Sequence, residues 1–538
     1  MAEMNKENIK QTQPVPGTTA VKRKLIRMVV PAYAAFNIYS AVANKTTALG
    51  PVALATVINK MDEWDVEIID ENNLRLYGPK GFPRGADHEF IQKIRPADMV
   101  GLYGGLTSTI PRLYEIAKFY KSQGVFVMAG GQHFADDNIE EALRSNIDLV
   151  CTGEGEDTVR EFLTAYAQNK DYKNIKGLAF LQNNKLVINP EREQIQDLDR
   201  LPLPDFSLVR YAKITLYPIG RIRGCGMDCE FCTVKGKPRC ASPEHFMENI
   251  RHLVETRDAK HFFMVDDLFG QYRNETIRFC NMLRDYQLSI GKRLDFTAQI
   301  RLDKAKDTEL LTAMREAAIN AVAIGFESPI EEELIAMKKQ IRPQDMVNLA
   351  RIYHKFGFLV HGMFIFGYPP KEGVEKTNMS MEERVKRFKK FFRDAKIDTV
   401  QVLLPVPLPG TELRDRLVKQ GRVYPLEQIG WEYYDGNFPI FEPDPPITAE
   451  ELHLAVRKIM GHFYQYKSVL WVILHTFSLP HIVFFFHHFK KGWASWKRRW
   501  KHSLLRMGGW GILSNWIAEF NKNPFSEKLT KAKQALKK

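Results

Sequence analysis

The stretch RGCGMDCEFC, residues 223–232, holds three of the six cysteines in this 538-residue chain. Its C-x3-C-x2-C spacing places Cys225, Cys229 and Cys232 on one tight loop, directly after a predicted strand. Three thiolates can bind three irons of a cubane and leave the fourth iron open to a small molecule. The glycines on either side of Cys225 let the backbone fold closely around such a group. The stretch therefore predicts a redox [4Fe–4S] cluster.

A zinc site is the main alternative for these cysteines. Zinc usually takes four ligands, commonly in two separated pairs. Cys240 is the nearest candidate for a fourth ligand, but it follows Cys232 by eight residues, past a Lys-Gly-Lys-Pro turn, and fits poorly. Six cysteines are too few for a disulfide framework and indicate a reducing compartment, so we expect a cytoplasmic protein.

Short apolar strands alternate with helices on both sides of the cysteine stretch. Six βα units lie around and beyond it and carry no dinucleotide fingerprint, which predicts a partial (β/α)6 barrel. Its strands are expected at 216–221, 261–265, 295–299, 321–325, 359–366 and 399–404. We assign residues 201–415 to this barrel.

A second alternation occupies residues 25–165 and predicts a doubly wound, Rossmann-like α/β domain with a parallel sheet. Ligands of such sheets bind outside the carboxyl ends of the strands. Three glycine-rich loops fall at those ends, and their candidate binding residues are Gly104, Thr107, Ser108, Gly130, Gly131, Gly153, Glu154 and Gly155. We assign residues 25–200 to this domain and its polar linker.

The cysteine spacing, with an aromatic residue before the third cysteine, resembles the radical S-adenosylmethionine (SAM) superfamily. The resemblance implies that the open iron chelates SAM, and that the reduced cluster cleaves SAM to methionine and a 5′-deoxyadenosyl radical. It implies an external electron donor such as flavodoxin or ferredoxin. It also implies that further residues meet SAM: Phe231 at the adenine, then Asp266, Asp267, Gln299, Arg301 and Glu327 at the following strand ends. The two aspartates stand where many members have Gly-Gly-Glu.

The sheet before the barrel resembles the cobalamin-binding domains of the same class. Glycines permit the close approach of a flat macrocycle, and hydroxyl groups suit its amide side chains. The Asp-x-His-x-x-Gly motif that supplies a cobalt ligand in other cobalamin domains is absent from residues 25–165. We therefore expect a corrin without that ligand, and we expect His133 to fix its loop. A flavodoxin-like sheet that binds nothing remains the alternative.

The net charge of +13 is concentrated at one end of the chain, because residues 461–538 hold 14 Lys and Arg against two acids. Within this end, the apolar residues 469–489 are interrupted by Pro480 and precede a cluster of basic residues and tryptophans. This pattern predicts a segment in the interface of an anionic membrane, on its inner face. A helical cap packed on the barrel is the alternative, and nucleic acid is not an expected partner. We assign residues 416–538 to a helical C-terminal region and expect residues 1–24 to be a disordered leader without a signal peptide.

Together these features predict an enzyme that uses a [4Fe–4S] cluster, SAM and cobalamin to methylate an unactivated carbon of a small molecule or lipid. One alternative is a radical cyclisation, hydroxylation or C–C bond formation without methylation. Another is a protein that only holds the cluster and the corrin.

Overall fold

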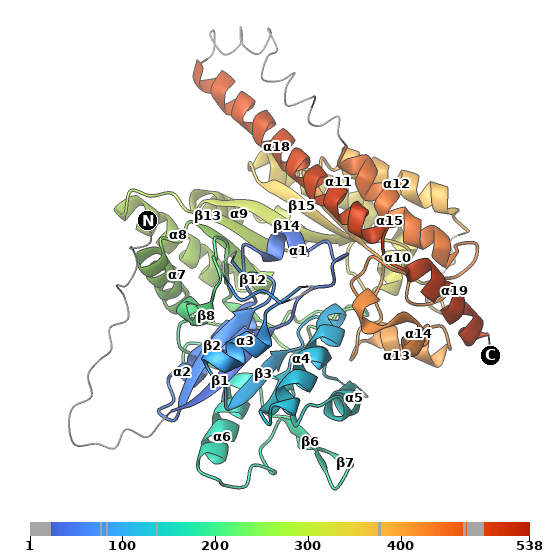
Figure 1. Cartoon of the computed structure of the whole chain (residues 1–538). Helices are drawn as coiled ribbons and strands as arrows, with labels where there is room; N and C mark the ends of the chain where they lie inside the picture. The colour runs from blue at the N-terminus through green and yellow to red at the C-terminus, as the bar shows by residue number, and fades with distance from the viewer. Residues whose placement is uncertain are drawn as a thin grey trace, which may run out of the picture.

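The computed structural model describes residues 23–75, 78–81, 84–135, 138–374, 378–465, 470 and 489–537, without the side chains of 489–503. Two sheets with their covering helices make up most of it (Figure 1). The chain crosses once from the N-terminal sheet to the second sheet. The C-terminal helices then return to contact both.

The N-terminal sheet has eight strands in the order β7-β6-β5-β4-β3-β1-β2-β8. Parallel pairing joins all of them except the β5–β6 and β6–β7 pairs, which are antiparallel. The strands are β1 Lys24–Val30, β2 Trp64–Asp70, β3 Met99–Tyr103, β4 Phe126–Gly130, β5 Leu149–Cys151, β6 Leu178–Gln182, β7 Lys185–Ile188 and β8 Val209–Arg210. β8 comes from a segment that the sequence analysis assigned to the barrel.

Helices cover both faces of this sheet because the strand order reverses at β1. The chain passes from β1 to its neighbour β2 on one side, and later from β3 to β4 and β5 on the other side. Right-handed crossovers then place α2 and α6 on one face and α3, α4 and α5 on the other (Figure 1). The short elements α1 and η1 lie in loops at the carboxyl edge. The bounds are α1 Ser40–Ala43, α2 Leu49–Asn59, α3 His88–Ile94, η1 Thr107–Thr109, α4 Ile110–Ser122, α5 Asn138–Arg144 and α6 Gly155–Ala167.

The second sheet is a partial barrel of six parallel strands in the order β16-β15-β14-β13-β12-β9. Buried and half-buried residues alternate along β13, β15 and β16, because one face packs on the helices and the other lines the interior. The strands are β9 Tyr217–Ile219, β12 His261–Phe269, β13 Asp295–Ile300, β14 Ile319–Glu327, β15 Leu359–Ile365 and β16 Thr399–Leu403. The helices are α7 Pro243–Arg257, α8 Arg273–Ser289, α9 Thr308–Glu316, α10 Glu331–Ala336, α11 Pro343–Lys355 and α12 Met381–Asp394. This architecture confirms the predicted fold class.

The C-terminal helices close the open side of the barrel. The Tyr464 hydroxyl, just after α15, accepts from the backbone N–H of Val400 on the edge strand β16 and donates to its C=O, both at 2.8 Å. Trp516 on α18 donates to the C=O of Phe36 in the N-terminal domain at 2.7 Å. These elements are α13 Glu412–Lys419, α14 Leu426–Ile429, η4 Trp431–Tyr433, α15 Ala449–Phe463, α18 Phe489–Phe520 and α19 Phe525–Leu536.

Part of the predicted membrane segment cannot be compared with the structure. Of the apolar stretch 469–489, only 470 and 489 belong to the described residues. Over the described part of the chain, no helix has both the length and the apolar character needed to cross a bilayer. The C-terminal half of α18 buries Leu513, Trp516 and Phe520 against the body, as a packed cap would.

Candidate active site

The cysteine loop, residues 224–232, leaves the short strand β10 (Ile222–Arg223), and the chain returns along β11 (Arg239–Cys240) as its antiparallel partner. Gly224 and Gly226 have φ values of +85° and +72°, a region that favours glycine. A Cβ on Gly224 would lie 2.7 Å from the C=O oxygen of Lys237. The loop therefore needs glycine at this position to remain closed on itself.

The three thiols of this loop lie near one another. Cys229 is buried, and Cys225 and Cys232 are half-buried. Burial raises the pKa of the Cys232 thiol, and the two neighbouring cysteines raise it further. Within the described residues, no set of three or more His, Cys, Asp or Glu side chains has the arrangement of ligands around a single ion. Three thiols on one short loop are the donor set of a [4Fe–4S] cluster that leaves one iron open.

Cys240 takes no part in this group of thiols. It lies on β11, where its sulfur is 3.9 Å from Nη2 of Arg221. The same guanidinium donates to the C=O of Ala241 at 2.8 Å. That Cys240 is not a fourth ligand stays a prediction.

Asp266 and Asp267, which are predicted to meet SAM, accept hydrogen bonds from the backbone next to the cysteines. The Asp266 carboxylate is buried and accepts from the N–H groups of Arg221 and Ile222, the latter at 2.9 Å. Asp267 accepts from the N–H of Gly224 at 2.7 Å. Burial raises the pKa of Asp266 to about 6, although the two backbone donors oppose that shift. The pair thus orients the start of the cysteine loop, a role that sequence reasoning missed.

Charged side chains converge beside Cys229 at the ends of β13 and β14. Lys339 donates a hydrogen bond to Glu327 at 2.7 Å. Burial raises the pKa of the Cys229 thiol. The Lys339 charge opposes this shift, and the Glu327 charge adds to it. Arg301 pairs with Asp303 at 2.9 and 3.1 Å, and its Nη1 lies 2.8 Å from the sulfur of Met227. Lys339 follows α10 in a short loop, where no sequence motif identifies it.

Two further features of this end of the barrel bear on the predicted SAM contacts. Glu327 has a φ of +60°, which is uncommon for a residue with a side chain and often marks a functional site. Gln299 is half-buried on β13, in the alternating set that lines the interior. The structure therefore brings Arg301 and Glu327 close to the cysteine loop and places Gln299 on the same interior face.

Glu230, between the second and third cysteines, anchors the loop to the C-terminal region. It is 1% exposed and accepts from the Tyr368 hydroxyl at 2.7 Å and from Arg416 at 2.9 and 3.0 Å. Burial would raise the pKa of this carboxyl, but the hydrogen bonds from Arg416 and Tyr368 lower it. The Phe231 ring meets Tyr368 edge to face with centroids 6.3 Å apart. Phe231 is thus held at the loop by Tyr368.

The glycines of the N-terminal sheet pack against one another at the carboxyl edge. A Cβ on Gly131 would lie 2.5 Å from the carbonyl carbon of Gly104, and one on Gly104 would lie 2.4 Å from the Phe134 ring. Thr107 and Ser108 in η1 are both buried, and the Thr107 hydroxyl contacts His133 inside the loop. At Gly104 and Gly131 the edge therefore has no room for a side chain.

His133 lies beneath this edge and is 1% exposed. Its Nδ1 is 3.3 Å from the Thr107 hydroxyl, and its ring meets Phe134 and Trp431 at 5.4 and 4.9 Å. Its Nε2 is buried and has no hydrogen-bond partner within the described ranges. Burial, together with the nearby Arg414 charge, lowers the pKa of His133 to about 3, so the ring is neutral. These contacts agree with the expected role of fixing the loop.

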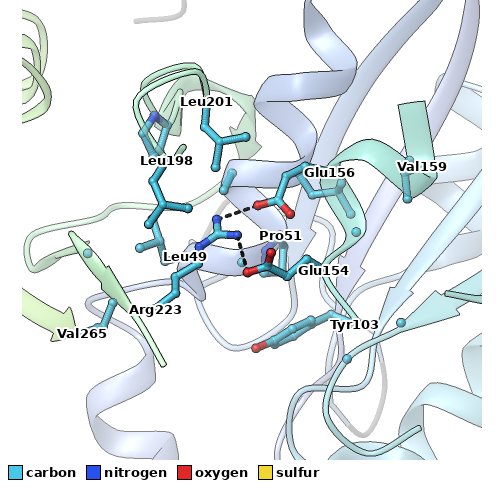
Figure 2. Close-up of a pocket in the computed structure, with 18 of the residues that line it drawn as sticks. Leu49, Pro51, Tyr103, Glu154, Glu156, Val159, Leu198, Leu201, Arg223 and Val265 are labelled. Carbon is cyan, nitrogen blue, oxygen red and sulfur yellow. Dashed lines mark hydrogen bonds and ion pairs between the residues drawn. The ribbon is translucent and has the colours of Figure 1, made fainter. Parts of the chain in front are cut away.

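A cavity of 460 Å³ opens between the two domains (Figure 2). One wall consists of the ends of β1, β3, β4 and β5. It includes five of the eight predicted corrin residues, but not Gly104, Thr107 or Ser108; the five are Gly130, Gly131, Gly153, Glu154 and Gly155. The facing wall comes from the start of the barrel and includes Asp267. The Arg223 side chain extends from the barrel along the cavity and donates hydrogen bonds to Glu154 and Glu156 (Figure 2). A glycine-lined, mostly apolar wall fits part of a flat macrocycle, and the cavity places that group beside the cysteine loop.

Two family models match the chain. Residues 38–163 match the B12 binding domain, and residues 219–378 match the radical SAM superfamily. The matches confirm both of the expected cofactor domains, in the expected order.

Proteins with related sequences include several methyltransferases. An uncharacterized methyltransferase of Pyrococcus horikoshii is 29% identical, over 78% of this chain and 88% of its own. The anaerobic magnesium-protoporphyrin IX monomethyl ester cyclase of Rubrivivax gelatinosus is 26% identical, over 68% and 65% of the two chains. The hopanoid C-2 methylase of Rhodopseudomonas palustris is 23% identical, over 60% and 68%.

Solved structures share the same fold. The radical SAM methyltransferase TsrM of Kitasatospora setae, solved with cobalamin and a [4Fe–4S] cluster bound, aligns with a TM-score of 0.60. The alignment covers 74% of this chain and 78% of TsrM, at 18% sequence identity.

Proposed function

Because the chain belongs to the cobalamin-binding radical SAM enzymes, we propose that it transfers a methyl group to an unactivated carbon of its substrate. The observation that carries the proposal is the cavity shared by the two domains. Its walls include the glycines of the N-terminal sheet and Asp267, which also holds the N–H of Gly224 in the cysteine loop. A corrin bound there would lie next to the cluster, as methyl transfer to a radical carbon requires.

The residues near the cysteines suit the groups that this chemistry needs. When bound, the cluster supplies an electron to SAM, and cobalamin supplies a transferable methyl group. Arg301 and Lys339 bring positive charge suited to a carboxylate, and Glu327 offers oxygens to hydroxyl or amine donors. The Phe231–Tyr368 contact forms an apolar wall that keeps water from the same space. We assign the cluster to Cys225, Cys229 and Cys232, and the SAM side to these residues together with Gln299.

A non-methylating radical cyclisation is the second candidate. The similarity to the anaerobic magnesium-protoporphyrin IX monomethyl ester cyclase favours it, because that relative matches more than two thirds of this chain. The two reactions differ in whether a methyl carbon of SAM enters the product.

A labelling experiment separates these candidates. Cells that express the chain, or its Cys225→Ala/Cys229→Ala/Cys232→Ala variant, receive methionine with a deuterated methyl group. A product that carries the label only with the unmodified chain supports methyl transfer. An unlabelled, cysteine-dependent product supports cyclisation. If the anaerobically reconstituted protein cleaves no SAM after reduction, the chain is not a radical SAM enzyme and both candidates fail.

We further propose that α18 makes a peripheral contact with the inner face of a membrane and brings the site to a lipid substrate. Its first half extends beyond the body of the molecule (Figure 1). Each basic residue near an anionic leaflet contributes about 1 kcal/mol of binding free energy. The similarity to a hopanoid methylase also favours a lipid substrate. Residues 489–503 contain no acid and hold Lys490, Lys491, Trp493, Trp496, Lys497, Arg498, Arg499, Trp500 and Lys501.

Sedimentation with anionic vesicles tests this contact. The full chain should sediment at low salt, and replacing its six basic residues between 490 and 501 with Gln should release it. We replace residues and do not delete the C-terminal region, because the second half of α18 is packed on the body. If the full chain stays in the supernatant, α18 is only a cap. The control replaces six exposed lysines elsewhere with Gln, at Lys60, Lys118, Lys170, Lys292, Lys386 and Lys458.

A further inference from the structure

Two arginines that bracket the cysteine loop bind the same carboxylate in the other domain. Arg223 ends β10, two residues before Cys225, and Arg239 on β11 is its cross-strand partner. Both bind Glu154, which follows β5 in the N-terminal domain. Arg223 Nη1 lies 3.2 Å from Glu154 Oε1, and Arg239 reaches both oxygens at 2.9 Å. One side chain of the N-terminal domain therefore holds both ends of the cysteine loop.

Charge makes this arrangement specific. Like charges directly opposite each other on paired strands repel, so the two arginines need an anion between them. Glu154 supplies it, and Glu156 accepts a second bond from Arg223 at 2.6 Å. The Arg239 side chain is only 8% exposed, and removing one partner of a buried ion pair leaves the other uncompensated. We call Glu154, Glu156, Arg223 and Arg239 the hub.

The Glu154 side chain binds the hub arginines and does not cap the helix that follows it. It occupies the N-cap position of α6, yet its side chain makes no capping hydrogen bond to that helix. Instead Oε2 accepts from the N–H of Ile195 in the linker at 2.8 Å. Burial would raise the pKa of Glu154, but the hydrogen bonds from Arg239 and Ile195 lower it, so the carboxylate is charged. The sequence predicted Glu154 as a corrin residue on the strength of its loop alone.

The hub forms part of the wall of the shared cavity. Glu154, Glu156 and Arg223 all line it, and Figure 2 shows the guanidinium of Arg223 between the two carboxylates. Gly153, the neighbour of Glu154, has a φ of +69° and no atom within 4 Å of an added Cβ, so the loop has space on that side. The loop that carries Glu154 is therefore part of the surface that a ligand in the cavity would contact.

We propose that the hub couples the two cofactor sites, with Glu154 as a positioning residue that transmits corrin binding to the cysteine loop. The proposal rests on the proposed function, because it requires both cofactors to bind. A corrin that shifts the loop at 153–155 moves the carboxylate to which both ends of the cysteine loop are tied. By thermodynamic linkage, a loaded cluster must change corrin affinity by the same factor as the corrin changes cluster binding.

The test compares hydroxocobalamin affinity in cluster-loaded and iron-free protein. For the unmodified chain we expect the two dissociation constants to differ by about 5- to 150-fold, the usual range of coupling between sites. In Glu154→Gln, which keeps the shape but not the charge, the ratio should fall to about twofold or less. The Mössbauer spectrum of the oxidised cluster should also change on addition of hydroxocobalamin in the unmodified chain and stay constant in the variant.

Two further variants keep the test decisive. Glu161→Gln, on the same helix, removes a carboxylate that pairs with Arg192 away from the cavity and should preserve the ratio. Arg223→Gln removes a barrel residue from the hub. As in Glu154→Gln, the ratio of the two dissociation constants should fall to about twofold or less. This second variant decides the matter if Glu154→Gln does not fold.

Each failure has its own signature. If Glu154→Gln binds hydroxocobalamin equally weakly with and without the cluster while Arg223→Gln keeps the ratio, Glu154 is a direct corrin ligand and the coupling proposal is wrong. An unchanged ratio in both hub variants overturns it as well. If the unmodified chain fails to bind either hydroxocobalamin or a cluster, the proposed function itself fails.

Discussion

The two edges that meet at the shared cavity are built from different parts of the polypeptide. The N-terminal sheet presents backbone, with Gly104 and Gly131 packed so closely that a Cβ on Gly131 would lie 2.5 Å from its neighbour. The barrel lines the cavity with Arg223 and Asp267, and next to this wall it presents the side chains of the cysteines together with Arg301 and Glu327. A broad, uncharged macrocycle needs open surface, whereas a small zwitterion such as SAM needs charged partners. We therefore expect added volume to damage the first edge, and lost thiols or charges to damage the second.

The largest effect should come from the barrel edge, through removal of its thiols. Replacing Cys225, Cys229 and Cys232 together with Ala should abolish the broad absorbance near about 400 nm that such clusters give. The remaining three cysteines lie outside the group, and Cys151 and Cys280 are buried. Cys151→Ala, Cys240→Ala and Cys280→Ala should therefore retain the iron. Loss of iron in Cys240→Ala, or zinc in the purified protein, would contradict the cluster.

At the sheet edge, Gly131→Ala should weaken cobalamin binding more than tenfold. The new Cβ would meet the backbone of Gly104, and such overpacking costs about 1–3 kcal/mol of folding stability. Gly124→Ala is the matched control, since Gly124 also has a positive φ of +72° but nothing within 4 Å of an added Cβ. Absorbance titration with hydroxocobalamin and thermal unfolding compare the two variants. Equal affinities would mean that the packed glycines do not shape the corrin site.

An effect that depends on pH should follow from Asp266→Asn. Burial raises the pKa of Asp266 to about 6 from 3.8, so the folded state favours the protonated form. The stability from this carboxyl is full below about pH 4 and is lost as the pH rises through 6. The asparagine does not titrate. The free energy of unfolding of the variant minus that of the parent should therefore rise by up to about 3 kcal/mol between pH 4 and pH 7.

Chemical denaturation of cluster-free protein at several pH values measures this difference without interference from the acid-labile cluster. Asp303→Asn offers a contrast, because the hydrogen bond and charge of Arg301 lower the pKa of that carboxyl although its burial opposes them. Its pH dependence should have the opposite sign. A flat difference for Asp266→Asn would show that the buried carboxyl keeps its charge.

The smallest change is expected for His133→Ala, in the electron paramagnetic resonance spectrum of bound cobalamin. The ring is held by Thr107, Phe134 and Trp431 beneath the sheet edge, and its pKa shift comes first from burial. We expect the electron paramagnetic resonance spectrum of bound cob(II)alamin to show no nitrogen splitting from an axial histidine, in either protein. Splitting that disappears in His133→Ala would identify this residue as a cobalt ligand.

Sequence patterns predicted the features that repeat or cluster locally. Strand periodicity identified both sheets, and the spacing of three cysteines identified the loop between them. β10 and β11 are two residues long and have no periodicity to detect. The partners of Glu154 and Glu230 are set by tertiary packing, since Arg239 and Arg416 lie 85 and 186 residues away in the chain. The sequence therefore marked the neighbourhood of each site but not the ion pairs that fix it.

The central claim is that one chain holds a corrin in the cavity between its domains and a cluster on the loop next to the facing wall. Its most direct test is the spin relaxation of cob(II)alamin bound to protein whose cluster is reduced and paramagnetic. We predict that the cob(II)alamin signal relaxes faster in cluster-loaded protein than in the triple cysteine variant, because nearby spins enhance relaxation. Identical relaxation in the two proteins, with cobalamin bound to both, would place the cofactors far apart and contradict the account.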